Sequence, residues 1–170
     1  MLKFLFLLLS VQQLLFGAER MQFGKETLET LEVQGFLKLC ETTISSSLQV
    51  TGALIAENAH IAAVDGVGDL QFFDTTVGEV HAVGALRASR STFQKPLYFC
   101  GQRGVFVHCH LADLIVEREF GFKGAQVIEL KEKSEVNGAI RFQGGNGKVF
   151  LYPGSRVLGE VTGGELVRKR

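Results

Sequence analysis

Proline, tryptophan and tyrosine are almost missing from this chain of 170 residues, which has two prolines, two tyrosines and no tryptophan. Proline lacks the backbone N–H that β-sheets use, so its scarcity is compatible with a continuously hydrogen-bonded sheet. Glycine is frequent instead, with 20 residues, well above its usual share of about 7%. Many glycines with almost no proline indicate tight turns in a continuously hydrogen-bonded fold and not a flexible linker.

A hydrophobic run of membrane-spanning length is also missing. The apolar stretch at residues 4–11 falls short of the roughly 20 apolar residues that a spanning helix needs, and Gln12 and Gln13 follow it. Lys3 before the run and Gly17-Ala18 after it give the layout of a secretory signal peptide. We therefore predict a helical signal peptide at residues 1–18 and an exported protein of the periplasm, cell envelope or medium. An uncleaved membrane anchor is the alternative.

Neither sign of charge is in excess, because 18 basic residues face 18 acidic ones. Such a balance argues against nucleic acid or an anionic membrane surface as the main partner. We expect no nucleic-acid partner, and membrane contact only through an uncleaved leader.

A short phrase of alternating apolar residues recurs along the rest of the chain. Its starts are Leu31, Leu48, Val64, Val80, Leu97, Leu114, Ile128 and Val149, separated by 17, 16, 16, 17, 17, 14 and 21 residues. Alternation indicates strands with one buried face. A unit of this length is too short to bury a core alone, whereas stacked units bury a continuous one.

The pattern predicts an all-β, single-domain parallel β-solenoid of about eight turns of 16–17 residues over residues 31–164. Residues 19–30 are predicted to form a polar segment or cap, and residues 165–170 a charged tail. Like residues stack in two predicted inward columns: Leu37, Leu54, Leu70 and Leu86, and Ile44, Ile61, Val77 and Phe93. The "QGGNG" at residues 143–147 is interpreted as a loop that lengthens one turn. An antiparallel β-sandwich is the alternative.

Two sets of side chains are candidates for binding. Thr43, His60, Thr76 and Thr92 share one position of the repeat and form a possible exposed face, of the kind that a glycan binder would use. His108 and His110 are weak metal candidates, because His-x-His on a strand sets two imidazoles on one face, but a zinc site needs further ligands. We predict no catalytic residue, no resident metal and no cofactor.

The three cysteines fall at different positions of the repeat. Cys40, Cys100 and Cys109 therefore should not stack, and no disulfide is predicted. Cys109 beside a histidine is formally a nucleophilic pair, but no third orienting group is identified.

The C-terminal half resembles the bactofilins, a family of polymer-forming bacterial scaffold proteins. The likeness is carried by Val136-x-Gly138-x-Ile140, followed by Val149-x-Leu151-x-x-Gly154-Ser155-x-Val157-x-Gly159-x-Val161. The resemblance implies a right-handed parallel β-helix that assembles end to end without nucleotide, and no catalytic residues. Bactofilins are typically cytosolic, so the leader of this chain would move such a scaffold to the periplasm or the cell surface.

Three classes of function follow. We expect a non-enzymatic, exported scaffold with a structural and assembly role in a bacterial cell envelope, which associates end to end with itself and contacts an envelope glycan or protein. The alternative is a surface or periplasmic binding module, such as an adhesin or glycan binder. An enzyme built on a β-helix, such as a polysaccharide lyase, is the third class.

Overall fold

The computed structural model describes residues 19–170, so the predicted signal helix at residues 1–18 lies outside the described residues. Those residues form 17 strands in one parallel sheet and contain no helix. The strands are β1 (Glu19–Phe23), β2 (Thr27–Cys40), β3 (Thr43–Glu57), β4 (His60–Phe73), β5 (Thr76–Ser89), β6 (Thr92–Phe93), β7 (Leu97–Cys100), β8 (Arg103–Val107), β9 (His110–Leu111), β10 (Leu114–Val116), β11 (Gln126–Lys131), β12 (Glu135–Val136), β13 (Ile140–Phe142), β14 (Gly147–Leu151), β15 (Arg156–Val157), β16 (Val161–Thr162) and β17 (Gly164–Arg168).

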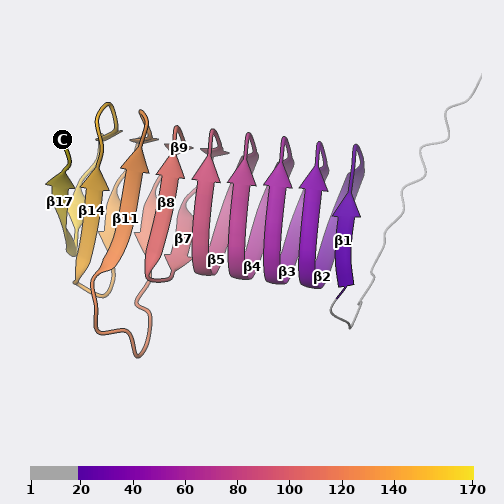
Figure 1. Ribbon diagram of the computed structural model, residues 1–170, viewed down its shortest axis with the longest axis horizontal. Helices are drawn as coiled ribbons and strands as arrows, with labels where there is room; N and C mark the ends of the chain where they lie inside the picture. Colours follow the sequence, from indigo (N-terminus) through magenta and orange to yellow (C-terminus); the bar gives the residue numbers. More distant parts are fainter. Residues whose placement is uncertain (1–18) are drawn as a thin grey trace, which may run out of the picture.

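The sheet winds into a rod, and the predicted parallel β-solenoid is confirmed. In Figure 1 the chain rises along the near face, crosses the top, descends along the far face and advances towards the C-terminal end at the left. This winding is right-handed. The near face carries residues 35–40 and their equivalents in other turns, the far face carries residues 31–34 and theirs, and the top edge carries residues 43–44 and theirs.

The core is built from columns of identical register. Leu37 pairs with Leu54, Leu54 with Leu70, and Leu70 with Leu86, and each of these side chains is fully buried. The second predicted column, Ile44, Ile61, Val77 and Phe93, is also in register and buried. Because each turn buries its apolar side chains against its neighbours, stability comes from stacking.

Glycine forms the corner between the far and near faces. Gly35, Gly52, Gly68 and Gly84 stack on one another and have φ between 117° and 136°, a region that side chains rarely adopt. A Cβ on Gly52 would overlap the carbonyl oxygen of Gly35, and one on Gly68 would overlap that of Gly52. The repeat therefore needs glycine here for both backbone conformation and close stacking.

The top corner uses a different device. Glu41, Asn58, Asp74, Arg90 and His108 turn the chain with φ between 49° and 55°. The next residue in each of these turns is small and buried: Thr42, Ala59, Thr75, Ser91 and Cys109. Ser134 and Ser155 continue this buried column after Lys133 and Gly154, which also have positive φ.

Hydroxyl groups in this column satisfy buried backbone groups. The Thr75 hydroxyl donates to the Phe73 carbonyl at 2.8 Å, and the Thr75 N–H donates to the Ser91 hydroxyl at 3.2 Å. The N–H of Cys109 likewise donates to the Ser134 hydroxyl at 3.1 Å. Buried backbone groups at the corner are costly when unpaired, so these hydroxyls hold the turns together.

Parallel pairing extends beyond the predicted limits of the solenoid at both ends. β1 pairs with residues 35–39 of β2, and β17 pairs with β14. Residues 19–30 and 165–170 therefore supply strands to the first and last turns, and the near face has nine strands (β1, β2, β3, β4, β5, β8, β11, β14 and β17) where eight turns were predicted. A terminal turn packs against a neighbouring turn on one side only. Its sequence therefore contains more polar residues, and the alternation of apolar and polar residues is weaker there.

The predicted starts at Ile128 and Val149 are wrong. Leu114 pairs with Ile140, and Ile140 pairs with Val161, so the later far-face strands begin at Ile140 and Val161. Ile128 and Val149 pair with each other on the near face instead. Residues 21 apart do occupy equivalent positions in successive turns, but these two residues lie on the near face and not at the predicted starts of the repeat.

Two insertions explain the difference, and both lie at the glycine corner. Nine residues, 117–125, connect β10 to β11, and four residues, 143–146, connect β13 to β14. A single residue, Gln34, occupies the same place in the regular turn between Val33 and Gly35. "QGGNG" is thus a lengthened corner, as predicted, and Figure 1 shows the longer loop, residues 117–125, projecting below the rod.

Candidate functional site

The predicted threonine face is a continuous column at the top edge. Thr43 pairs with His60, His60 with Thr76, and Thr76 with Thr92. The three threonine side chains are half-buried, while His60 is exposed. His110 continues the column after Thr92. Imidazoles at two positions interrupt the threonines, so the edge is not a uniform array of hydroxyls.

His108 and His110 do not share one strand. β8 ends at Val107 and β9 begins at His110, and His108 turns the corner with φ 55°. The two imidazoles therefore do not lie on one face of a single strand, as the interpretation of a metal site required. Within residues 19–170, no group of three or more His, Cys, Asp or Glu side chains is placed to hold a metal ion.

The three cysteines lie in three separate environments and are unbridged. Cys40 is on the near face, where its thiol donates to a Glu57 oxygen at 3.6 Å, and Cys100 is on the far face. Cys109 is fully buried at the top corner, and burial raises the pKa of its thiol to about 11. Such a thiol stays protonated near neutral pH, which is unfavourable for a nucleophile.

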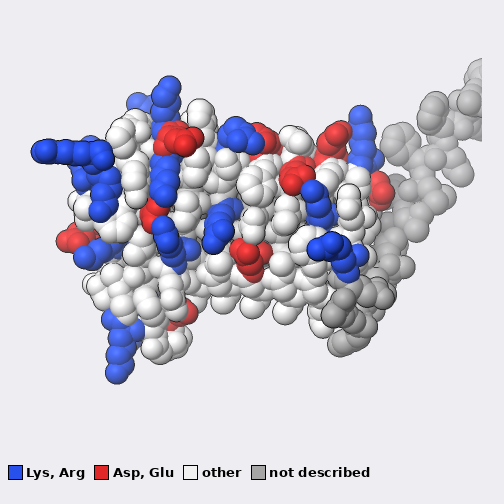
Figure 2. All heavy atoms as spheres, viewed as in Figure 1, with Lys and Arg blue, Asp and Glu red and all other residues white. Residues whose placement is uncertain are grey.

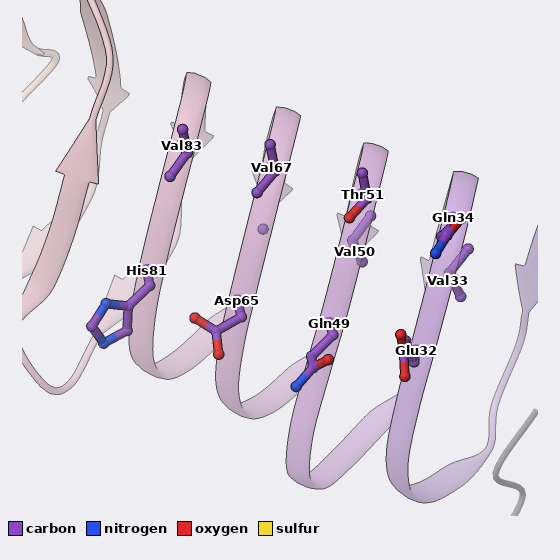
Figure 3. A pocket seen from close by; sticks show the side chains of 11 residues that line it. Glu32, Val33, Gln34, Gln49, Val50, Thr51, Asp65, Val67, His81 and Val83 are labelled. Atoms are coloured by element: carbon purple, nitrogen blue, oxygen red, sulfur yellow. The ribbon is translucent and has the colours of Figure 1, made fainter. Parts of the chain in front are cut away.

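A shallow groove of about 310 Å³ crosses the far face over four turns. Figure 3 shows two rows of outward side chains along it: Glu32, Gln49, Asp65 and His81, and Gln34, Thr51, Val67 and Val83. Val67 and Val83 are 50% and 44% exposed. The His81 ring stacks on Tyr98 of the next turn, with ring centroids 4.5 Å apart. The groove can hydrogen-bond an extended chain lying along the rod, but it holds no catalytic constellation. The groove was not predicted from the sequence, because only the threonine positions of the repeat were interpreted as an outward column.

Charges of both signs cover the near face. Glu129 is nearly buried there and contacts Arg103 and, at 2.6 Å, Lys131. Burial opposes ionisation of Glu129, but these two cations outweigh it and hold the pKa of the carboxyl below its ordinary value. Figure 2 shows mixed signs over this face, with Lys and Arg gathered towards the C-terminal end at the left. The face as a whole therefore offers no patch of one sign.

The two ends of the rod are sheet edges. Within residues 19–170, no strand pairs with the outer edge of β1 or of β17. The core is less covered there. Met21, Phe23 and Leu28 are partly buried at one end, and Val157 and Val161 at the other, where Leu166 is 39% exposed. Edges of this kind are templates for pairing with another chain.

Residues 19–170 contain no helix capable of crossing a membrane. Comparisons with protein-family models, with curated proteins and with solved structures give no significant match to the chain.

Proposed function

We propose that this protein is a non-enzymatic, exported scaffold of a bacterial cell envelope, and that it assembles end to end through the edges of its solenoid. The observation that carries the proposal is the pair of parallel edges with which no strand of residues 19–170 pairs, each with apolar side chains left partly exposed. The export signal expected at residues 1–18 and the resemblance to polymer-forming bactofilins support the location and the role.

The register of the turns specifies how two copies would join. If β1 of a second copy continued the stack after β17, Leu166 would lie beside the second copy's Met21. The far face and the top edge each have one strand fewer than the near face, so Val161 and Val157 would not pair directly with the second copy's Leu31 and Leu28. The near-face column would then continue across the joint, which removes Leu166 and Met21 from water.

Charge favours the same head-to-tail arrangement. Residues 19–34 carry four carboxylates and two cations, whereas residues 156–170 carry four cations and two carboxylates. The continued register would also set Glu165 beside Arg20 of the next copy. Opposite charges steer the unlike ends together, and two like ends repel each other.

Sedimentation velocity and negative-stain microscopy over a concentration series test the proposal. We expect the mass to grow with concentration, and rods to lengthen without becoming wider. Leu166→Asp, at the C-terminal edge, should abolish growth because it places a charge in the joint. Val83→Asp is the matched control, since Val83 is a similarly exposed apolar residue on the far face, and it should assemble like the wild type.

The second candidate is a surface or periplasmic binding module, which the far-face groove favours. The same concentration series separates the two functions. A binding module stays monomeric at every concentration, and that result would overturn the scaffold proposal.

A further inference from the structure

The regular spacing of the turns is broken most strongly at one place, the glycine corner of two successive turns. Residues 117–125 and 143–146 replace single residues there, and they lie next to each other because β11 pairs with β14. In repeat folds, insertions gather on one side and commonly form the binding surface. The two loops are therefore a candidate binding surface.

Hydrogen bonds hold the two loops together and fix them to the rod. Gln126 is 95% buried, and its side-chain N–H groups donate to the carbonyl oxygens of Gly101 at 3.0 Å and Glu117 at 2.8 Å. The Asn146 side chain donates to the Gly124 carbonyl at 3.2 Å, which links one loop to the other. The space between the two loops is thus lined by the buried amide of Gln126 and by two loops that a hydrogen bond holds together.

That space is a cleft of about 300 Å³, separate from the far-face groove. Its lining comes from both loops and the adjoining strand: Arg118, Glu119, Phe122, Lys123, Gly124, Gln126, Gly144 and Asn146. Two cations outnumber the single carboxylate. Glu119 has one buried oxygen, Oε2, without a hydrogen-bond partner in the described part of the chain. A buried carboxylate oxygen left in this way is costly, so rotation of the Glu119 side chain towards a ligand's hydroxyl group in the cleft would be favourable.

We propose that this cleft binds an acidic sugar, a hexuronate unit of a polysaccharide. The carboxylate of such a sugar suits Arg118 and Lys123, because charge-assisted hydrogen bonds from these groups are strong. The half-buried Phe122 supplies an apolar surface for the face of the sugar ring. The hydroxyls of the sugar suit the Glu119 carboxylate and the side-chain oxygens of Gln126 and Asn146, because both N–H groups of Gln126 already donate within the protein. An inorganic anion would leave Phe122 and Glu119 unused.

The inference goes beyond the scaffold role and does not depend on it. The cleft lies on the side of the rod, at the corner between two faces, and not at either edge where copies would join. A chain of stacked copies would repeat the cleft once per copy, so weak binding to a polyuronate would gain strength from multivalency.

Isothermal titration of the full-length protein with a trimer of galacturonic acid tests the inference. The methyl ester of the same trimer is the neutral comparison. We expect the acid to bind at least about fivefold more tightly than the ester, and its affinity to fall as salt is added. Lys123→Gln and Phe122→Ala should each weaken binding of the acid by at least about fivefold. Lys95→Gln, an exposed lysine outside the cleft, should change it by less than about twofold.

Equal binding of acid and ester, no binding of either in the millimolar range, or no effect of Lys123→Gln would overturn the site. Thermal melting of each variant shows whether a loss reflects unfolding, and a lost signal in a folded variant supports the site. Sedimentation of the same samples reports assembly separately, so failure of sugar binding and failure of the scaffold role give different results.

Discussion

At the scale of single residues, Cys109 shows how a repeat tolerates a chemical exception. It occupies a column that otherwise holds small side chains, most of them hydroxyl-bearing, and its thiol donates to the Val107 carbonyl at 3.3 Å. Burial is the main reason that the pKa of this thiol rises to about 11, from an ordinary value of 9.0. The thiol therefore acts as a core side chain and a weak hydrogen-bond donor.

This raised pKa predicts a pH dependence of stability. The unfolded chain releases the Cys109 proton at a lower pH than the folded chain does. The stability linked to this thiol is therefore complete below pH 9 and is lost as pH rises towards about 11. Cys109→Ser lacks that thiol, so urea unfolding should show a smaller loss of stability between pH 8 and pH 10.5 for the variant than for the wild type.

Cys40 and Cys100 are present in both proteins, so the comparison isolates Cys109. Serine already occupies the same column at Ser91 and Ser134, and the variant should fold. An identical loss of stability in the two proteins would show that the thiol does not titrate with unfolding.

At the scale of one turn, stability depends on the inward columns. Leu54 is fully buried between Leu37 and Leu70. Leu54→Asp would place a carboxylate in the continuous core without a partner, and should lower the free energy of unfolding by at least about 4 kcal/mol. Val67→Asp, in the next turn but 50% exposed, should change it by less than about 1 kcal/mol. Circular dichroism during urea unfolding measures both, and a normally folded Leu54→Asp would contradict the register.

Sequence alone could predict the regular turns. The first six starts, from Leu31 to Leu114, all lie on the far face, because glycines and apolar residues recur at an almost constant spacing. The prediction failed at Ile128 because the inserted residues 117–125 lengthen the corner, so that the next apolar run after Leu114, at Ile128, is the near-face strand of the same turn. Both faces have the same alternation of apolar residues, so the pattern could not distinguish them.

The candidate sites were less predictable than the turns. The threonine column followed from the repeat, because its members share one position. The cleft between the loops could not be inferred in that way, since Phe122 and Asn146 belong to different insertions that interrupt the repeat. Only the pairing of β11 with β14 brings these insertions together.

At the scale of the whole molecule, the rod has two unlike ends. One carries Met21 and a surplus of carboxylates in its turn, and the other carries Leu166 and a surplus of cations. Nine turns at about 4.8 Å give a rod on the order of 43 Å long. Assembly of unlike ends would produce a polar filament with this axial repeat, whereas assembly of like ends would produce a filament without polarity.

Mixing two edge variants tests the head-to-tail account most directly. Met21→Asp blocks the first edge and leaves the last edge free, and Leu166→Asp does the reverse. Analytical ultracentrifugation should find each variant monomeric alone, because each lacks one of the two unlike edges, and an equimolar mixture should form a dimer and nothing longer. Dimers of either variant alone, or a mixture that stays monomeric while the wild type assembles, would contradict the account.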